Sequence, residues 1–425
     1  MFYGWWIVVL LFLSSLFSGA VIWYGFTAFF SPLANEFGWS YTAISLAASL
    51  RGVEMGLLDM PAGFLVDRFG GRRIVFIGSM LVGLGYLILS GIDSLATFYI
   101  SFLIIFCGAT GLGMVVVAAI LNRWFSKRLG LALGIVSAGF GAGGFAVPYI
   151  VYLMDLVGFR MVFVIFGIAS IIIGGFLACF LRSRPEDIGY GPNGVLRYGR
   201  EYTSERVNKH NVLSTSPAVS YTFKEAVSEP PFWIIAYVGT VSILTVSMVT
   251  THVMPYLEHL GYSRNVASIA AMMIPVTSIV GRLGLGWISD LINRKLMLIL
   301  ITAGQFFAMV LFYYAHLSFL LIPFVLLFGV SYGGLSVLRV PVLKDYYGTT
   351  NIGSIIGVCF GLSAFGGIVG PLLAGWLFDT TNSYSLPWII SSILLLSSVP
   401  LILTLKNPLT MEMGYAYEDI SGDRS

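Results

Sequence analysis

The sequence has few charged residues. Only 10% of its 425 residues are Asp, Glu, Lys or Arg, compared with roughly a quarter in a typical soluble protein. The hydrophobic fraction is 57%, which is more than the interior of a soluble domain of this size can bury. These two values exclude an ordinary soluble enzyme and indicate a polytopic membrane protein in contact with lipid. The formal net charge of +3 is small, so we expect no nucleic-acid partner.

Cysteine and catalytic motifs are also scarce. The three cysteines, Cys107, Cys179 and Cys359, lie in apolar runs, which argues against a disulfide framework and against a metal site. The sequence lacks a phosphate-binding glycine loop, a metal-binding His and Cys spacing, and a nucleophilic serine motif. We therefore predict that the protein is not an enzyme, holds no metal or cofactor, and is not a pump driven by ATP.

Long apolar runs, in contrast, are abundant. A helix needs about 20 apolar residues to cross the hydrocarbon core, and this length predicts an all-α integral membrane protein with twelve spans. They lie near residues 5–30, 40–62, 74–92, 96–121, 130–153, 160–181, 231–257, 265–286, 297–316, 318–341, 352–377 and 386–405. The first run starts almost at Met1 without a basic region before it, so we expect a retained span rather than a cleaved signal peptide.

One polar stretch divides the chain. Residues 182–229 are rich in Gly, Pro, Ser and charge, which predicts a cytoplasmic linker. It separates an N-terminal six-helix bundle, residues 1–181, from a C-terminal one, residues 230–425, with a short cytoplasmic tail. With the amino terminus inside, only Arg160 and Arg264 among the basic residues fall in outer loops. The positive-inside rule therefore places both termini in the cytoplasm, in a plasma or inner membrane protein.

The two halves repeat each other at an offset of 223 residues. The matched pairs include Pro32 with Pro255, Gly38 with Gly261, Ser40 with Ser263, Gly130 with Gly353, Gly134 with Gly357, Gly144 with Gly367 and Pro148 with Pro371. Because the offset covers an even number of helices, the two six-helix repeats are parallel and related by an axis along the membrane normal. Such a pair encloses a central cavity.

A charged motif occurs in both repeats. The segment GFLVDRFGGRR, expected in the loop after the second span, has a degenerate copy GWISDLINRK after the eighth. The motif resembles the signature of the major facilitator superfamily, and the alternative is a simple basic loop that sets topology. We assign a conformational role to Gly63, Asp67, Arg68, Arg72, Gly286 and Asp290.

Three further segments are more specific. They are FYGWW near the start, NRWFSKRLGLALGIVSAGFGAGG over residues 122–144, and THVMPYLEHLGYS over residues 251–263. Together they resemble the monocarboxylate transporter family and its bacterial relatives, which include the oxalate/formate antiporters. The resemblance implies secondary transport of a small monocarboxylate, such as lactate, pyruvate or acetate, by proton symport and alternating access. We expect a functional monomer whose partners are a small organic anion and a proton.

A charge inside the membrane is costly and indicates function. Arg282 lies in the eighth span, where the resemblance implies binding of the substrate carboxylate. The alternative is a structural pair with Asp59, its repeat equivalent. Animal family members carry an acid where this chain has Ser278, so proton coupling must use other residues. The eleventh span lacks the lysine of the oxalate antiporters, and a single cation favours a monoanion.

The proton-coupling candidates are His252, Glu54, Arg51 and Asp59. The ordinary pKa of a histidine side chain, near 6.5, suits His252 in the seventh span to reversible protonation, although a histidine hydrogen-bonded to a neighbouring helix is an equal alternative. Arg51 and Glu54 lie three residues apart on one face of the second span. They form either an internal salt bridge or a cavity pair in which protonation of Glu54 frees Arg51 for an anion.

Aromatic residues complete the predicted cavity. Tyr24 in the first span, Tyr332 in the tenth and Phe360 in the eleventh lie where the cavity-lining helices of the family run. We predict that they bind substrate with Arg282 and Ser278, although most membrane aromatics only pack. Alternative functions are a carboxylate exchanger without net proton movement, a transporter of another small organic anion, an exporter of hydrophobic compounds, or a non-transporting receptor. An exporter of cations is disfavoured by Arg282.

Overall fold

The computed structural model describes residues 3–125, 128–182, 221–289, 291–348 and 352–405. Every regular element in these ranges is helical. The N-terminal half contains α1 (Tyr3–Ser18), η1 (Gly19–Tyr24), α2 (Phe26–Phe37), α3 (Tyr41–Val53), η2 (Glu54–Leu58), α4 (Asp59–Phe69), α5 (Gly71–Ser90), α6 (Leu95–Thr110), α7 (Met114–Trp124), α8 (Leu129–Ala142), η3 (Gly143–Ala146) and α9 (Val147–Phe180). The C-terminal half contains α10 (Phe223–Ser228), α11 (Pro230–His259), α12 (Arg264–Val280), η6 (Gly281–Leu285), α13 (Gly286–Ser289), α14 (Arg294–Tyr313), η7 (Ser318–Leu320), α15 (Leu321–Tyr347), α16 (Ile352–Thr381) and α17 (Ser385–Thr404).

Helices long enough to cross a membrane recur along the chain. In the described ranges, ten continuous helical stretches are long and apolar enough to do so. One of them, residues 129–180, turns at Gly158, where φ is 77°, and therefore supplies two crossings. The stretch 41–69, with five charged residues, is not among the ten and forms a twelfth crossing. The prediction of an all-α protein with twelve transmembrane helices is confirmed.

The internal repeat is visible in local structure. Gly38 ends α2 with φ of 63°, and Gly261 follows the end of α11 with φ of 88°; glycine adopts this left-handed backbone at little cost. Two residues later, the hydroxyls of Ser40 and Ser263 accept hydrogen bonds from backbone N–H groups in the first turns of α3 and α12, which is the usual role of an N-cap serine. The same turn and cap therefore begin the second span of each half.

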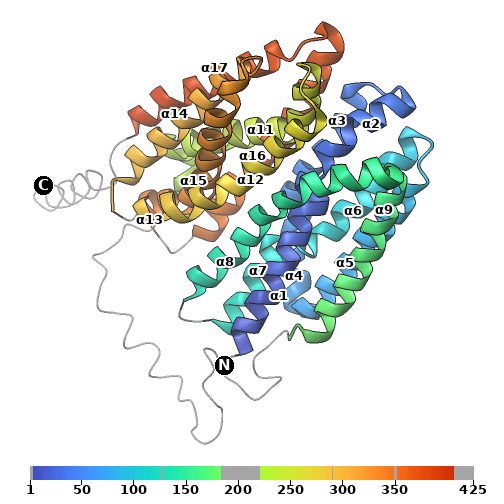
Figure 1. The fold of residues 1–425 in the computed structure, drawn as a ribbon. Coiled ribbons are helices and arrows are strands. Elements are labelled where there is room, and N and C mark those ends of the chain that lie inside the picture. The colour runs from blue at the N-terminus through green and yellow to red at the C-terminus, as the bar shows by residue number, and fades with distance from the viewer. Residues whose placement is uncertain (1–2, 126–127, 183–220, 290, 349–351, 406–425) are drawn as a thin grey trace, which may run out of the picture.

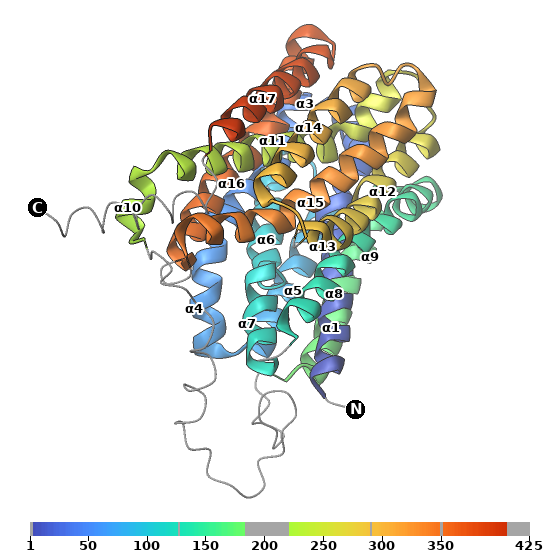
Figure 2. The ribbon, with the colours of Figure 1, turned by 90° about the vertical axis from the view of Figure 1, so that its left-hand side faces the viewer.

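The two halves lie side by side, with α1 to α9 toward the lower right of Figure 1 and α11 to α17 toward the upper left. We call the end at which α9 ends and α11 begins the linker side, and the end at which α2 ends and α12 begins the far side. The amino terminus lies on the linker side, at the bottom of Figure 2. Between the halves, α3 packs on α16, α2 packs on α11, and α12 packs on α8, η3 and α9.

Glycines show where these contacts are close. A Cβ atom on Gly52 of α3 would lie 2.5 Å from Cγ1 of Ile368, and one on Gly144 of η3 would lie 2.3 Å from Cγ of Pro275. On the linker-side parts of α8 and α16, by contrast, a Cβ atom on Gly130, Gly134, Gly353, Gly357 or Gly361 would meet no described residue within 4 Å. The halves therefore meet closely at mid-depth and toward the far side, whereas these five glycines face open space.

The charged motif differs in part from the expectation. We expected residues 63–73 to form a loop, but residues 63–69 continue the helix α4, and Gly70, with φ of 82°, makes the turn into α5. The helix continues because its backbone hydrogen bonds do not depend on apolar side chains, and the N–H of Gly70 still bonds to the carbonyl of Val66. The length of the apolar run alone therefore placed the helix end too early.

Candidate functional site

Arg282 lies between the two halves. It is the second residue of η6, and it is half-buried. Its Nη1 donates to the carbonyl and the hydroxyl of Ser137 on α8, at 2.7 and 3.0 Å. Its Nη2 lies 3.4 Å from the hydroxyl of Tyr332, and its Nε is buried without a hydrogen-bond partner. In the part of the chain that the structure describes, no carboxylate forms an ion pair with this guanidinium.

Aromatic residues from both halves surround this guanidinium. The hydroxyls of Tyr24, at the end of η1, and Tyr332, on α15, lie 3.4 Å apart. The guanidinium carbon of Arg282 is 5.9 Å from the ring centre of Phe140 and 5.5 Å from that of Tyr332, which is within cation–π range. The Tyr24 ring packs edge-on against Phe140. A cation, two hydroxyls and two ring faces thus converge.

The structure therefore brings together three of the five residues predicted to bind substrate: Arg282, Tyr24 and Tyr332. Sequence reasoning missed Ser137 and Phe140, which lie three residues apart on α8, within a segment quoted above only for its family pattern. The only signal was their i, i+3 spacing on one helix face, which many residue pairs share.

The other two predicted substrate residues have different partners. Phe360 packs against the guanidinium of Arg339, whose central carbon is 4.2 Å from the ring centre. Arg339 is only 7% exposed and donates to the hydroxyl of Ser363 at 2.6 Å. Ser278 is fully buried and donates to the carbonyl of Pro275, in its own helix, at 2.6 Å.

His252 is fully buried in α11 and joins four elements. Its Nε2 lies 3.0 Å from the carbonyl of Pro371 on α16 and 3.1 Å from the hydroxyl of Ser45 on α3. Its Nδ1 lies 3.0 Å from the hydroxyl of Tyr384, which precedes α17. Because a carbonyl only accepts, Nε2 carries the proton of the neutral ring, and the hydroxyl of Tyr384 donates to Nδ1. The bonds to neighbouring helices agree with the structural alternative, and His252 also meets the N-terminal half.

Arg51 and Glu54 are both buried at the junction of α3 and η2, with exposures of 5% and 4%. The guanidinium of Arg51 lies over the rings of Trp23 and Phe26, at 5.6 and 5.1 Å, and its Nε and Nη2 have no hydrogen-bond partner among the described residues. The Trp23 ring in turn packs edge-on against Phe140. Arg51 and Arg282 therefore contact the same group of aromatic rings from opposite ends.

The motif residues lie on the linker side. Gly63 and Asp67 belong to α4 and Asp59 begins it, but the side chains of the two aspartates lie outside the described part of the chain. Arg68 is exposed beside the ring of Phe69. The remaining motif positions are Arg72, exposed in the first turn of α5, Gly286, the first residue of α13, and Asp290, which lies outside the described residues.

Acidic residues connect the halves on the far side. The carboxylate of Asp379, near the end of α16, accepts the backbone N–H groups of Tyr41 and Thr42 at 2.9 and 2.7 Å, and it also accepts the hydroxyl of Thr42. It therefore caps the start of α3, where the helix dipole favours a negative charge. Glu258 of α11 accepts a hydrogen bond from Ser31 of α2. These bonds join the C-terminal half to the N-terminal half.

Two helical halves that meet around a half-buried cation define a multi-pass membrane protein of the transporter class. The family model "Major Facilitator Superfamily" matches residues 8–358 and 265–412. The chain belongs to this superfamily, and it is a membrane transporter rather than an enzyme. The first resemblance noted in the sequence is confirmed.

Curated relatives point to one branch. The chain is 27% identical to monocarboxylate transporter 13 of Bos taurus over 412 residues, which are 95% of this chain and 89% of the relative. It is 27% identical to monocarboxylate transporter 12 of Mus musculus, over 90% of this chain and 81% of the relative. An uncharacterized transporter of the superfamily, YhjX of Escherichia coli (strain K12), is 24% identical over 79% of each chain. These relatives support the resemblance to the monocarboxylate transporters.

Solved structures agree on the fold. A bacterial homologue of the human lysosomal transporter Spinster, in an inward-facing and unoccupied conformation, matches with a TM-score of 0.72 at 15% identity, over 94% of this chain and 96% of that chain. The nucleoside transporter NupG matches with a TM-score of 0.71 at 12% identity, over 94% of this chain and 99% of that chain. At these identities the matches establish the major facilitator fold.

Proposed function

We propose that the protein is a secondary active transporter of a small monocarboxylate of the lactate, pyruvate or acetate type, working by proton symport with alternating access. One observation carries this proposal: Arg282 is a half-buried guanidinium between the halves, with no carboxylate partner among the described residues. A cation in such a place is costly unless an anion compensates it. The relatives named as monocarboxylate transporters agree with a carboxylate as that anion.

The substrate carboxylate binds the guanidinium of Arg282. Its Nε has no partner, so a carboxylate could accept bonds from Nε and one Nη in the bidentate geometry that arginine favours. The hydroxyls of Tyr24 and Tyr332 can donate to a second substrate oxygen, and Phe140 faces its apolar part. In this proposal Ser278 and Phe360 act indirectly, Ser278 by shaping α12 and Phe360 by covering Arg339.

A proton crosses with the anion and neutralises it. His252 is the first candidate because it lies in a contact between the halves. Glu54, buried near Arg51, is the second, and Asp59 is the third. Protonation of Glu54 would leave the charge of Arg51 uncompensated and would thereby create a second attraction for an anion.

In the proposed alternating access, we assign the described conformation as inward-facing. The halves are joined by hydrogen bonds on the far side, whereas Gly130, Gly134, Gly353, Gly357 and Gly361 face open space toward the linker side. We assign the linker side to the cytoplasm of a cell with the protein in its plasma or inner membrane, so that both termini are cytoplasmic. The bundles of residues 1–181 and 230–425 then rock about the central site within one functional monomer, with residues 182–229 as the linker.

Carboxylate exchange is the second candidate. His252 is fully buried and hydrogen-bonded at both ring nitrogens in this conformation, which also suits a transporter that moves no net proton. Another small organic anion would bind Arg282 by the same chemistry.

Uptake into proteoliposomes tests the proposal. Radiolabelled lactate uptake should rise when an inward proton gradient is imposed, and Arg282→Ala should reduce it by at least about tenfold because a charge-assisted bond is lost. Arg160→Gln is a matched control, since Arg160 is exposed and pairs with Glu36 away from the site, and it should transport normally. Uptake that ignores the gradient but requires internal substrate would identify the exchanger. Normal gradient-driven uptake by Arg282→Ala would contradict the proposed site.

A further inference from the structure

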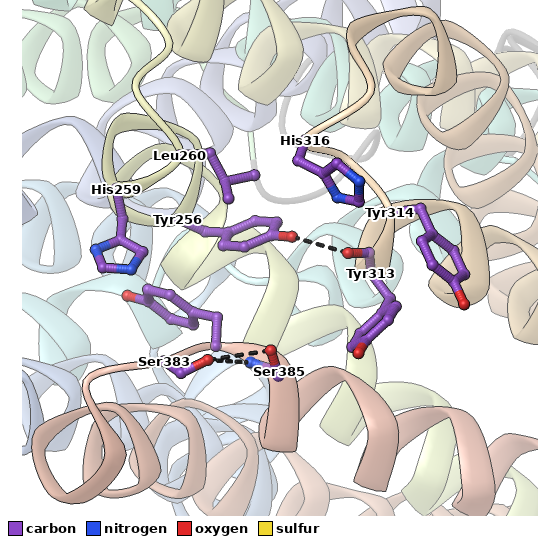
Figure 3. Close-up of a pocket in the computed structure, with 9 residues that line it drawn as sticks. Tyr256, His259, Leu260, Tyr313, Tyr314, His316, Ser383 and Ser385 are labelled. Atoms are coloured by element: carbon purple, nitrogen blue, oxygen red, sulfur yellow. Dashed lines mark hydrogen bonds between the residues drawn. The ribbon is translucent and has the colours of Figure 1, made fainter.

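A cavity lies in the C-terminal half on the far side, separate from the site at Arg282 (Figure 3). Its volume is about 250 Å³. It is formed by the end of α11, the segment after α14 and the start of α17. The lining residues are Tyr256, His259, Leu260, Tyr313, Tyr314, His316, Ser383, Tyr384 and Ser385.

The cavity has an exposed rim and a buried floor. His259, Tyr314 and His316 are exposed, whereas Tyr384 is only 1% exposed and Tyr256 is 5% exposed. The hydroxyl of Tyr256 is already used, since it donates to the carbonyl of Phe312 at 3.0 Å. The other buried hydroxyl of the floor, on Tyr384, points inward to Nδ1 of His252, at 3.0 Å.

Tyr384 therefore both lines the cavity and contacts a buried titratable ring. We infer that this cavity is the far-side access route for protons, and that Tyr384 relays them to His252. The inference rests on the proposed proton symport and specifies its proton path. It identifies the cavity as a site for water and hydronium rather than for the carboxylate, because its lining supplies hydroxyls and imidazoles and no Arg or Lys.

Every proton in the proposed relay is accounted for, as each O–H or N–H bond that forms is matched by one that breaks. The oxygen of Tyr384 takes a proton from hydronium in the cavity, forming a new O–H bond, while its original O–H bond breaks and that proton forms an N–H bond at Nδ1 of His252. One water remains in the cavity, the tyrosine is unchanged, and the ring becomes imidazolium. The N–H at Nε2 still donates to Pro371. Tyrosine suits this step because a hydroxyl both donates and accepts.

Burial opposes a charge on His252, and its polar and acidic neighbours offset part of that cost. Phe30 of α2 packs on the ring, Ser45 of α3 and the carbonyl of Pro371 are its polar neighbours, and Asp379 of α16 is the carboxylate that acts on it electrostatically. Tyr384 is in turn influenced by Tyr41, Asp379 and Glu258. A buried imidazolium is costly unless a carboxylate compensates it, and Asp379, which also caps α3, offsets part of that cost.

Tyr384→Phe tests the relay. The change removes the hydroxyl and keeps the ring, which stacks on Trp388 with centres 5.6 Å apart. We expect lactate uptake driven by a proton gradient to fall by about tenfold or more, while counterflow between equal internal and external lactate at matched pH stays within about twofold, since counterflow needs no net proton movement. Tyr262→Phe is the matched control: it also removes a far-side hydroxyl, bonded to Ala315 at 2.7 Å, and should leave both rates unchanged.

A second test leaves Tyr384 intact. In Tyr314→Cys, a bulky membrane-impermeant thiol reagent should plug the rim and abolish gradient-driven uptake while sparing counterflow. The same reagent on Phe319→Cys, an exposed far-side position outside the cavity lining, and on the wild type is the control. If plugging has no selective effect, or if Tyr384→Phe keeps gradient-driven uptake or loses counterflow equally, the relay is wrong. Absence of gradient stimulation in the wild type would instead refute the proposed symport.

Discussion

Gly52 offers a test of the proposed alternation between conformations. It lies where α3 crosses α16, and a Cβ atom there would be 2.5 Å from Cγ1 of Ile368, 2.6 Å from its backbone nitrogen, and 2.8 Å from the carbonyl oxygen of Ala364. Two of these three atoms belong to the backbone and cannot rotate away. Gly52→Ala therefore forces the two helices apart in this conformation, and we expect it to favour the conformation that is open on the far side.

The size of the shift follows from the contact. Overpacking a close interface costs about 1–3 kcal/mol, and about 1.4 kcal/mol is a factor of ten in an equilibrium constant. If the strain is relieved when the far side opens, the population ratio changes by about 5- to 150-fold. Gly361→Ala is the matched control, since a Cβ there would meet nothing within 4 Å among the described residues. Gly56→Ala should shift the ratio less than Gly52→Ala, because its Cβ would lie 3.2 Å from the Cβ of Ala364.

The assay is the reactivity of a cysteine placed under the far-side closure. Thr27 is 2% exposed and accepts the backbone N–H of Met254 from the other half at 3.3 Å. Thr27→Cys, in a background where the exposed Cys107 and Cys179 are replaced by Ser, should react slowly with an impermeant maleimide added from the far side. Adding Gly52→Ala should speed the reaction by about 5- to 150-fold. An unchanged rate in folded protein would refute the reasoning.

Three further predictions concern single contacts. Arg282→Lys keeps the charge but loses the planar fork, so the KM for lactate uptake should rise by about tenfold, and an unchanged KM would exclude bidentate binding. Asp379→Ala removes the cap of α3, which should cost about 1–2 kcal/mol and lower the apparent Tm by several degrees in a thermal unfolding assay; an unchanged Tm would show that the cap adds no stability. In the capping box of α10, the backbone N–H of Thr222, and then its hydroxyl, lower the pKa of Glu225. The capping box should therefore be intact above the ordinary carboxyl pKa of about 4.3 and weaken as pH falls through the lower pKa of the folded state. NMR titration of the carboxyl group measures this pKa, and an ordinary value would contradict the cap.

Much of the fold could be predicted because membrane physics leaves few solutions. Apolar length identified all twelve crossings. The structure adds that the second span of each half begins after a serine cap, at Ser40 and at Ser263. The end of the second span was placed near residue 62, whereas the helix runs to Phe69. Asp67 and Arg68 end the apolar run there but do not end the helix, because backbone hydrogen bonding continues beyond the hydrocarbon core.

The site was harder to predict because it depends on how the halves meet. Arg282 could be found alone, since an intramembrane arginine is rare in any context. Its contact with Ser137 could not, because spacing within one half carries no information about the other half. Phe360 was assigned to the cavity from its span, but a span has several faces, and this residue lies on the one that packs on Arg339.

The two residues proposed to hold the anion and the proton share one structural property. Arg282 donates to Ser137, and His252 bonds to Ser45, so each reaches from the C-terminal half to a serine of the N-terminal half. A carboxylate bound to the guanidinium, or a proton that charges the imidazole, perturbs a side chain that bonds across the two halves. In the proposed mechanism each ligand therefore has different affinities for the two conformations, which is the condition for shifting their populations. By linkage the anion then raises the affinity for the proton by the same factor as the proton raises the affinity for the anion. Coupling through the contact between the halves is then sufficient for symport, without a further pathway between the two sites.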